Sequence, residues 1–229
     1  MEKIMISDNI KNIKERINAA KKQAGRENDV TLVAVTKTRS VEEIMQVIDS
    51  GVKDLGENRV QEFMEKYDKL PSDVRWHIIG TLQSNKVKYI IDKVYMIHSV
   101  DRNSLVDEID RQAKLKGVNM NILLQVNVAR EPQKHGYEAD EVKDALLYCA
   151  TKENITVRGI MMMAPAHIEE SELEKFFTKT ENIYSELMNF SAEYDNINID
   201  TLSMGMTDDF ESAVKCGSNT VRIGRALFI

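Results

Sequence analysis

Cysteine and proline are scarce in this sequence. The 229 residues include two cysteines, three prolines and ten glycines, which excludes collagen-like, low-complexity and disulfide-framework proteins. Cys149 and Cys216 lie far apart and make no CxxC pair, as expected of reduced thiols in a cytosolic protein. A chain of this length can bury a core large enough to fold without covalent cross-links.

Long apolar runs are also missing. None is long enough to cross a bilayer, and residues 1–14 lack the unbroken apolar core of a secretory signal. We therefore expect a cytoplasmic protein that does not bind membranes. The 31 basic and 37 acidic residues give a formal charge of −6, which argues against broad nucleic-acid binding.

Several motifs that define enzyme classes do not occur. The sequence has no GxGxxG or GxxxxGK(S/T) segment for a nucleotide, and no GxSxG elbow for a hydrolase nucleophile. It also has no HExxH motif, and His98, His135 and His167 are not spaced as metal ligands. We therefore expect no metal site.

What the sequence does have is an alternation of strand-like and helix-like segments. Helical periodicity covers 7–24, 41–50, 103–116 and 171–189, and Ser40 and Ser171 each precede a glutamate at the capping-box spacing. Runs rich in β-branched and apolar residues predict eight strands, at 31–37, 52–56, 74–80, 94–100, 121–128, 156–163, 199–203 and 220–224.

This alternation predicts parallel strands covered by helices. Eight strands in about 230 residues fit a (β/α)8 TIM-type barrel with an extra N-terminal helix, near the short end of that fold's range. A doubly wound open sheet is the alternative. No linker or internal sequence repeat divides the chain, so we expect one domain over residues 1–229.

Lys37 ends the first predicted strand. In a barrel, strand ends of this kind point at the active site. A partly buried lysine there has a lowered pKa and forms a Schiff base with an aldehyde. The alternative is a strand-end lysine whose amine reaches water along the surface.

The loops after the last two predicted strands carry glycines beside small or charged polar residues. Ser203 and Gly205 follow the seventh strand, where residues 207–216 read as a helix, and Gly224 and Arg225 follow the eighth. Barrels often bind a phosphate group at these two loops. Together with Lys37, they indicate a phosphorylated aldehyde as ligand, whereas taken alone they are ordinary strand-ending turns.

The chain resembles the pyridoxal phosphate homeostasis proteins, which are single-domain relatives of the alanine racemase barrel. The resemblance extends over nearly the whole chain in the family's order. It rests on the segments 32–37, 56–62, 76–83 with Asn85 and Lys86, 134–136, 158–162, 202–206 and 221–224.

The resemblance implies a pyridoxal 5′-phosphate (PLP) site in which Lys37 carries the cofactor as a Schiff base. It places Arg222 beside the pyridine nitrogen and Asn58 near the ring, and it includes His77 in a Trp-His motif on the third strand. It assigns the phosphate to Ser203, Gly205, Gly224 and the backbone of Arg225. Arginine at position 225 departs from the small hydroxyl residue of many relatives, and the chain ends sooner than theirs do.

The resemblance implies a carrier of PLP that acts in intracellular PLP homeostasis and delivery. A permanently charged Arg222 disfavours protonation of the pyridine nitrogen and so restrains carbanion chemistry. The second domain that supplies a racemase with its tyrosine base does not follow Ile229. The alternatives are a weak PLP-dependent amino-acid racemase or lyase, and a phosphosugar barrel enzyme with a catalytic Lys37.

The same resemblance bears on partners. We expect apo forms of PLP-dependent enzymes as recipients, and a monomer or weak dimer. Lys134, after the fifth predicted strand, is either a solvated loop lysine, which we favour, or a second landing point for the aldehyde.

Overall fold

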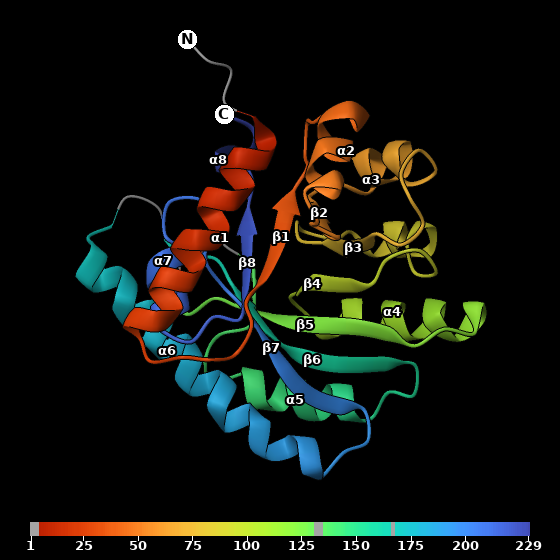
Figure 1. Ribbon diagram of the computed structural model, residues 1–229. Helices are drawn as coiled ribbons and strands as arrows, with labels where there is room; N and C mark the ends of the chain where they lie inside the picture. The colour runs from red at the N-terminus through yellow and green to blue at the C-terminus, as the bar shows by residue number, and fades with distance from the viewer. Residues whose placement is uncertain (1–4, 131–134, 166–167) are drawn as a thin grey trace.

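Eight parallel strands close into a barrel in sequential order, from β1 next to β2 round to β8 next to β1. The computed structural model describes residues 5–130, 135–165 and 168–229, and all statements below concern these residues. The predicted (β/α)8 barrel is confirmed, and the open sheet is excluded (Figure 1). The strands are β1 (Thr31–Val35), β2 (Asp54–Glu57), β3 (Arg75–Ile78), β4 (Met96–Val100), β5 (Met120–Val126), β6 (Ile155–Met162), β7 (Ile197–Ser203) and β8 (Thr220–Ile223).

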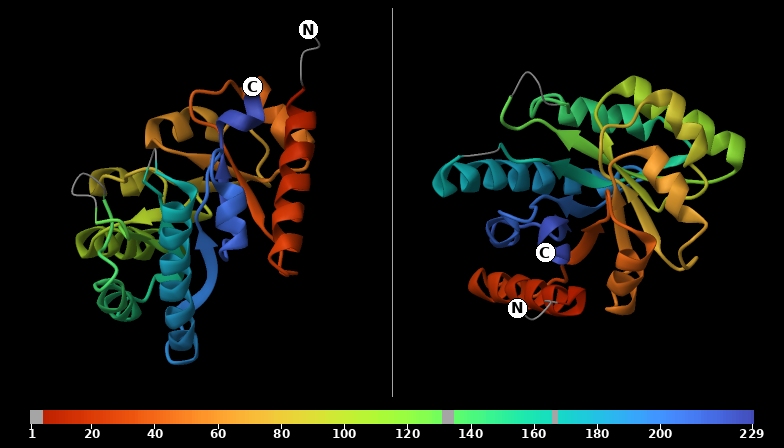
Figure 2. Two further views of the ribbon diagram at one scale, coloured as in Figure 1. Left: turned by 90° about the vertical axis from the view of Figure 1, so that its left-hand side faces the viewer. Right: turned by 90° about the horizontal axis from the view of Figure 1, so that it is seen from above.

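Helices lie between successive strands and cover the outside of the barrel (Figures 1 and 2). They are α1 (Ile6–Gln23), α2 (Val41–Asp49), α3 (Val60–Tyr67), α4 (Asn103–Lys116), α5 (Val142–Ala150), α6 (Glu170–Met188), α7 (Phe210–Lys215) and α8 (Arg225–Phe228), with 3-10 turns η1 (Ser84–Tyr89) and η2 (Asn189–Ala192). No helix in these described ranges combines the length and the apolarity needed to cross a bilayer.

The two predicted capping boxes have different outcomes. At α2, Ser40 Oγ accepts from the Glu43 N–H at 3.2 Å and Glu43 Oε2 accepts from the Ser40 N–H at 2.9 Å, so this prediction is confirmed. The prediction at Ser171 is wrong. Helix α6 already begins at Glu170, with Glu169 as N-cap, so Ser171 lies inside the first turn.

The extra N-terminal helix packs against the end of the chain. Figure 1 shows α1 beside α7 and α8, and Arg16 on α1 forms a bidentate pair with Glu211 on α7, at 3.1 and 2.7 Å. The side-chain amide of Asn9 donates to the carbonyls of Leu227 and Ile229, at 3.2 and 3.0 Å. Helix α1 therefore fastens the β8–α8 segment, which follows one of the candidate site loops.

The barrel interior is partly apolar and partly polar. Met96, Leu123 and Met161 form a small cluster, separate from the main core between sheet and helices. Buried polar side chains lie within the same barrel, on β2, β3, β4, β7 and β8: Asp54, His77, His98, Ser203 and Arg222. Each of these buried polar groups needs a hydrogen-bond partner, because burying an unpaired polar group costs free energy.

Candidate functional site

Lys37 lies two residues beyond β1, at the carboxyl-terminal end of the barrel. The first strand ends at Val35 rather than at Lys37, because the chain turns through Thr36 and reaches a φ of +60° at Thr38. Lys37 is exposed. The expectation of a partly buried lysine at the end of the strand is therefore wrong for this structure, which presents a solvated amine.

The turn before Lys37 is held by a buried ion pair that sequence reasoning missed. Lys66 on α3 donates to Glu57 Oε1 at 2.6 Å and to the carbonyl of Thr36 at 2.8 Å, and Thr36 Oγ1 donates to the same carboxylate oxygen at 2.7 Å. On the other side of Lys37, the Thr38 N–H donates to Glu62 Oε2 at 3.0 Å. The backbone on both sides of Lys37 is thus fixed by side chains from β2 and α3.

Glu57 itself is fully buried. Burial raises the pKa of its carboxyl group, and the hydrogen bonds from Lys66 and Thr36 only partly offset that effect. Within the described residues, Glu57 Oε2 has no hydrogen-bond partner. Little in the sequence predicted this ion pair. The segment 60–67 is too short for a clear helical period, and the burial of Lys66 depends on packing.

The first residues of the loop after β7 pair with strand β8. The Met204 N–H donates to the carbonyl of Thr220 at 3.2 Å, and the Arg222 N–H donates to the carbonyl of Gly205 at 3.0 Å. Gly205 has a φ of +96°, and a Cβ there would lie 2.7 Å from the Cβ of Ala213. Glycine is therefore required for this loop to fold back against α7.

Gly224 connects these loops to the Lys37 side of the barrel. A Cβ at Gly224 would lie 3.3 Å from the Cβ of Val35, the last residue of β1. The loop after β8 thus packs on the strand that leads into Lys37, and three loops meet at one end of the barrel.

Arg225 begins the short helix α8, and its side chain turns away from the barrel axis toward Asp208. Its Nη2 lies 2.6 and 2.8 Å from the two carboxylate oxygens of Asp208, and the arginine side chain is 62% exposed. The charge of Arg225 is therefore paired at the surface with a residue of the loop after β7.

Asn58 directly follows β2 and is half-buried. The loop after β3 passes very close to it, because a Cβ at Gly80 would lie 2.4 Å from the carbonyl oxygen of Asn58. The glycine permits this contact, and the contact keeps Asn58 at the same end of the barrel as Lys37.

Arg222 lies inside the barrel and is almost completely buried. Its guanidinium donates to Ser203 Oγ at 2.6 Å and to the carbonyl of Met162 at 2.9 Å. Burial lowers the pKa of Arg222 to about 10, against a smaller opposite effect of the Asp209 carboxylate. The group therefore remains a cation at neutral pH, as the resemblance implies for a residue beside a pyridine nitrogen.

His77 lies in the middle of the barrel, not at its carboxyl-terminal end. Its Nε2 is 2.9 Å from Asp54 Oδ1, and its Nδ1 is 2.9 Å from Nε2 of His98, whose own Nδ1 lies 3.1 Å from Ser203 Oγ. Both ring nitrogens of His77 are thus engaged with protein groups. His98 belongs to this arrangement, although the sequence analysis considered it only as a metal ligand.

The hydrogen bonds of His77 continue through Asp54 to the amino-terminal mouth of the barrel. Asp54 Oδ2 accepts from Arg75 Nη2 at 2.5 Å, and half of the Arg75 side chain is exposed. Burial pushes the pKa of Asp54 upward, but the hydrogen bonds from His77 and Arg75 outweigh it, so the pKa lies below its usual value. Asp54 is therefore a carboxylate at neutral pH.

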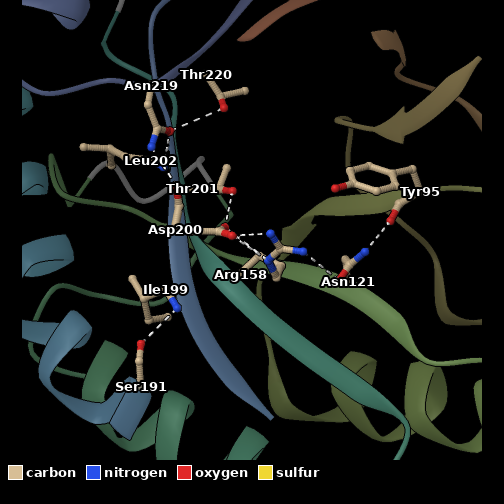
Figure 3. A network of polar contacts seen from close by, with 10 residues as sticks. All are labelled: Tyr95, Asn121, Arg158, Ser191, Ile199, Asp200, Thr201, Leu202, Asn219 and Thr220. Atoms are coloured by element: carbon tan, nitrogen blue, oxygen red, sulfur yellow. Dashed lines mark hydrogen bonds and ion pairs between the residues drawn. The ribbon is translucent and has the colours of Figure 1, made fainter. Parts of the chain in front are cut away.

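A cavity of about 70 Å³ lies at this mouth, lined in part by Tyr95, Thr201 and Thr220. Figure 3 shows these residues beside the ion pair between Arg158 on β6 and Asp200 on β7. His77 and His98 also line this cavity.

The predicted site residues therefore fall into two groups. Lys37, Asn58, Ser203, Gly205, Gly224 and Arg225 lie at the carboxyl-terminal end of strands or just beyond it, whereas His77 and Arg222 lie within strands. Lys134 lies outside the described residues.

The comparisons with known proteins agree with this geometry. The family model described as "Alanine racemase, N-terminal domain" matches residues 9–229. A curated pyridoxal phosphate homeostasis protein from Aquifex aeolicus is 40% identical over 223 residues, which is 96% of each chain. An alanine racemase structure from Clostridium difficile, 16% identical with a TM-score of 0.71 over 96% of this chain and 59% of its own, shows the shared fold.

A solved relative has been described both with and without PLP. The protein PipY from Synechococcus elongatus has a TM-score of 0.87 and 28% identity without PLP, over 98% of this chain and 100% of its own. The structure with PLP bound has a TM-score of 0.80 and 30% identity, over 94% and 99%. With this fold, these relatives and the family match over nearly its whole length, the chain belongs to the pyridoxal phosphate homeostasis proteins of the alanine racemase N-terminal domain family.

Proposed function

We propose that this protein binds PLP through a Schiff base on Lys37 Nζ. The observation that carries the proposal is that the Lys37 loop meets the loops of Gly205 and Gly224 at one end of the barrel. The residues fit such a ligand, because an exposed amine suits its aldehyde and backbone N–H groups in glycine-bearing loops suit its phosphate. PipY, 30% identical, has been solved with PLP bound, which supports the assignment.

Each site residue then has a role. Ser203, Gly205, Gly224 and the backbone of Arg225 would hold the phosphate, and Asn58 would lie near the ring. Arg222 faces the pyridine nitrogen, where its fixed charge disfavours protonation of that nitrogen. Bound PLP supplies an aldehyde that combines with amines and a ring that withdraws electrons, and Arg222 weakens the second property. The site therefore favours holding the cofactor over turning over amino acids.

We further propose that the protein stores and delivers PLP in the cytoplasm as a single-domain monomer or weak dimer. The amine of Lys37 is exposed, so an incoming amine has access to the carbon that Lys37 holds. When that amine takes its place, Lys37 Nζ leaves as a free amine and the bond count is unchanged. Apo forms of PLP-dependent enzymes are the recipients that this exchange implies.

The first test is an absorbance spectrum of the purified protein before and after borohydride reduction, followed by mass mapping of the adduct. We expect a visible imine band that disappears on reduction and a stable adduct on Lys37. Lys37→Ala should lose both, whereas Lys114→Ala, which removes an exposed lysine on α4, should keep them. Absence of the band, even after addition of PLP, would contradict the proposal and favour a phosphosugar ligand.

A second measurement separates a carrier from an enzyme. We expect holoprotein mixed with an apo PLP-dependent enzyme to restore that enzyme's activity, and we expect no amino-acid turnover by the holoprotein alone. Racemisation or lyase activity that disappears in Lys37→Ala would show instead that the site is catalytic.

A further inference from the structure

A continuous chain of buried hydrogen bonds crosses the barrel from the proposed phosphate site to the opposite mouth. In order, it joins Arg222, Ser203, His98, His77 and Asp54, with successive contacts of 2.6, 3.1, 2.9 and 2.9 Å. All five side chains are less than a tenth exposed. The proposed function uses the Ser203 and Arg222 end and gives no role to the rest.

At each end of this chain, the chemistry of the terminal group fixes the direction of its hydrogen bond. A guanidinium has donors and no acceptor, so Arg222 must donate to Ser203 Oγ. A carboxylate has acceptors and no donor, so Asp54 must accept from His77 Nε2. The directions of the two bonds between them, at His98, depend on how many protons the pair of imidazoles holds.

The surroundings favour two neutral imidazoles. His98 is fully buried, and burial together with the positive charge of Arg222 lowers its pKa well below the usual value. The charged groups that face the pair are Asp54 on β2, Arg75 on β3 and Arg222 on β8, with the Tyr95 ring beside His77. Asp54 already pairs with Arg75, so a further buried cation would have no unpaired anion beside it.

With both rings neutral, only one arrangement satisfies every contact. His77 uses its single proton, on Nε2, to donate to Asp54, so its Nδ1 must accept from His98 Nε2–H. The Nδ1 of His98 then has no proton and must accept the hydroxyl proton of Ser203. The oxygen of Ser203 is left with a lone pair and no proton to offer a ligand.

We infer that the His77–His98 pair is a protonation switch that sets whether Ser203 accepts from or donates to a ligand at the phosphate site. In the neutral pair, Ser203 faces the ligand as an acceptor, and backbone N–H groups alone hold a phosphate. One added proton reverses the chain and makes Ser203 a donor. This consequence for PLP rests on the proposed function, whereas the switch itself concerns the protein without ligand.

The reversal conserves atoms and needs one proton from the solvent or from the ligand. That proton binds His98 Nδ1, and the proton of His98 Nε2 passes across 2.9 Å to His77 Nδ1. His77 becomes the imidazolium, next to Asp54, and His98 remains neutral with its proton toward Ser203. The hydroxyl proton of Ser203 is released from His98 and turns to the ligand.

Asp54→Asn should reverse the chain without an added proton. Arg75 can only donate, so it holds the amide oxygen of the new side chain and turns the amide nitrogen toward His77 Nε2. His77 must then carry its proton on Nδ1, His98 must carry its own on Nδ1, and Ser203 becomes a donor. Asp73→Asn is the matched control, because Asp73 is an exposed acid two residues before β3 whose partner is Lys53.

The experiment is a ¹⁵N correlation spectrum of the imidazole groups in the protein without cofactor, at pH 7.5. The sequence has four histidines, so assignment by single substitutions is practical. We expect neutral Nε2–H forms for His77 and His98 in the wild type and in Asp73→Asn, and Nδ1–H forms in Asp54→Asn. Nδ1–H or imidazolium forms in the wild type would overturn the inference, even if Asp54→Asn failed to fold.

A binding measurement with inorganic phosphate and with PLP tests the consequence at Ser203. A hydrogen bond to a charged group corresponds to roughly a tenfold change in affinity, so we expect Asp54→Asn to bind both about tenfold more tightly than the wild type. Adding Ser203→Ala should remove that gain. An unchanged affinity in Asp54→Asn, despite reversed histidines, would overturn the role of Ser203. If the histidines have the expected forms but PLP does not bind, the proposed function is contradicted and the protonation switch is not.

Discussion

Gly205 illustrates how one residue shapes the proposed phosphate loop. Its φ is +96° and its missing Cβ would lie 2.7 Å from Ala213. We expect Gly205→Ala to lower the free energy of unfolding by about 1–3 kcal/mol, because it adds backbone strain and a clash. Urea denaturation measures this loss, and PLP titration should show weaker binding because the loop must move.

The matched control for Gly205 is Gly117, the C-cap of α4. Its φ is +66°, but no atom lies within 4 Å of a Cβ placed there. Gly117→Ala therefore tests strain without a clash, and we expect a loss of about 1 kcal/mol and unchanged PLP binding. Equal effects of the two substitutions on binding would contradict the role given to Gly205.

The Glu57–Lys66 ion pair permits a second test by substitution of single residues. Lys66→Met removes the cation and leaves a fully buried carboxylate beside the Lys37 turn. Breaking a buried pair from one side typically costs about 3–5 kcal/mol, which we expect here in urea denaturation. Adding Glu57→Gln should recover much of the loss, since no buried charge then remains. A double variant as unstable as the single one would show that Lys66 acts through packing alone.

Particular residues show which features of the site could be predicted from the sequence and which could not. The position of Lys37 close to the end of the first strand, and the small polar and glycine residues of the last two loops, followed from the order of the chain. The exposure of Lys37 did not, because it depends on the turn at Thr36 that Glu57 and Lys66 hold. Partners brought together only by the closed barrel, such as His77 and His98, carry no local signal.

Among the helices, the two candidate caps provide a matched pair of substitutions. Ser40→Ala removes two reciprocal hydrogen bonds at the start of α2, and we expect it to lower the free energy of unfolding by about 1 kcal/mol. Ser171→Ala should have almost no effect, because Ser171 lies inside α6 and is not its cap. Thermal or urea denaturation of the two variants tests this difference in stability. A similar loss of unfolding free energy in both would contradict the assigned caps.

The order and type of the strands were predictable because most lie in short segments rich in apolar and β-branched residues, and such segments suit a parallel sheet covered on the outside. Their ends differ from the prediction by at most two residues, since hydrogen bonding to neighbouring strands decides where pairing stops. Strand β7 begins at Ile197, two residues earlier than predicted, where it pairs with Val157. The short helices α3 and α5 carry too few turns for periodicity to identify them.

For the whole molecule, the barrel has two mouths with different chemistry joined by one buried polar chain. The carboxyl-terminal mouth holds Lys37 and the glycine loops, and the amino-terminal mouth holds the paired acid Asp54 and Arg75. Helix α1 fastens α8 and the residue after it from outside through Asn9. The proposed ligand site at one mouth and the Asp54–Arg75 pair at the other are therefore joined by hydrogen bonds through the barrel interior.

This connection predicts how stability depends on pH. His98 has a pKa well below its usual value in the folded chain, because the ring is buried and faces His77 and Arg222. In the unfolded chain it titrates near pH 6.5. As the pH falls through that value, His98 takes up a proton in the unfolded state and not in the folded state, so stability falls, by up to about 1.4 kcal/mol per pH unit for this group.

His98→Gln removes that proton from the unfolded state. We expect urea denaturation at pH 7.5, 6.5 and 5.5 to show a lower stability for the variant at pH 7.5, because the buried chain is broken, but a shallower loss below pH 6.5. The exposed His135 is the matched control, and His135→Gln should keep the wild-type dependence. A variant that loses stability with acid as steeply as the wild type would mean that His98 takes up a proton in the folded protein, and the chain across the barrel would then not rest on two neutral rings.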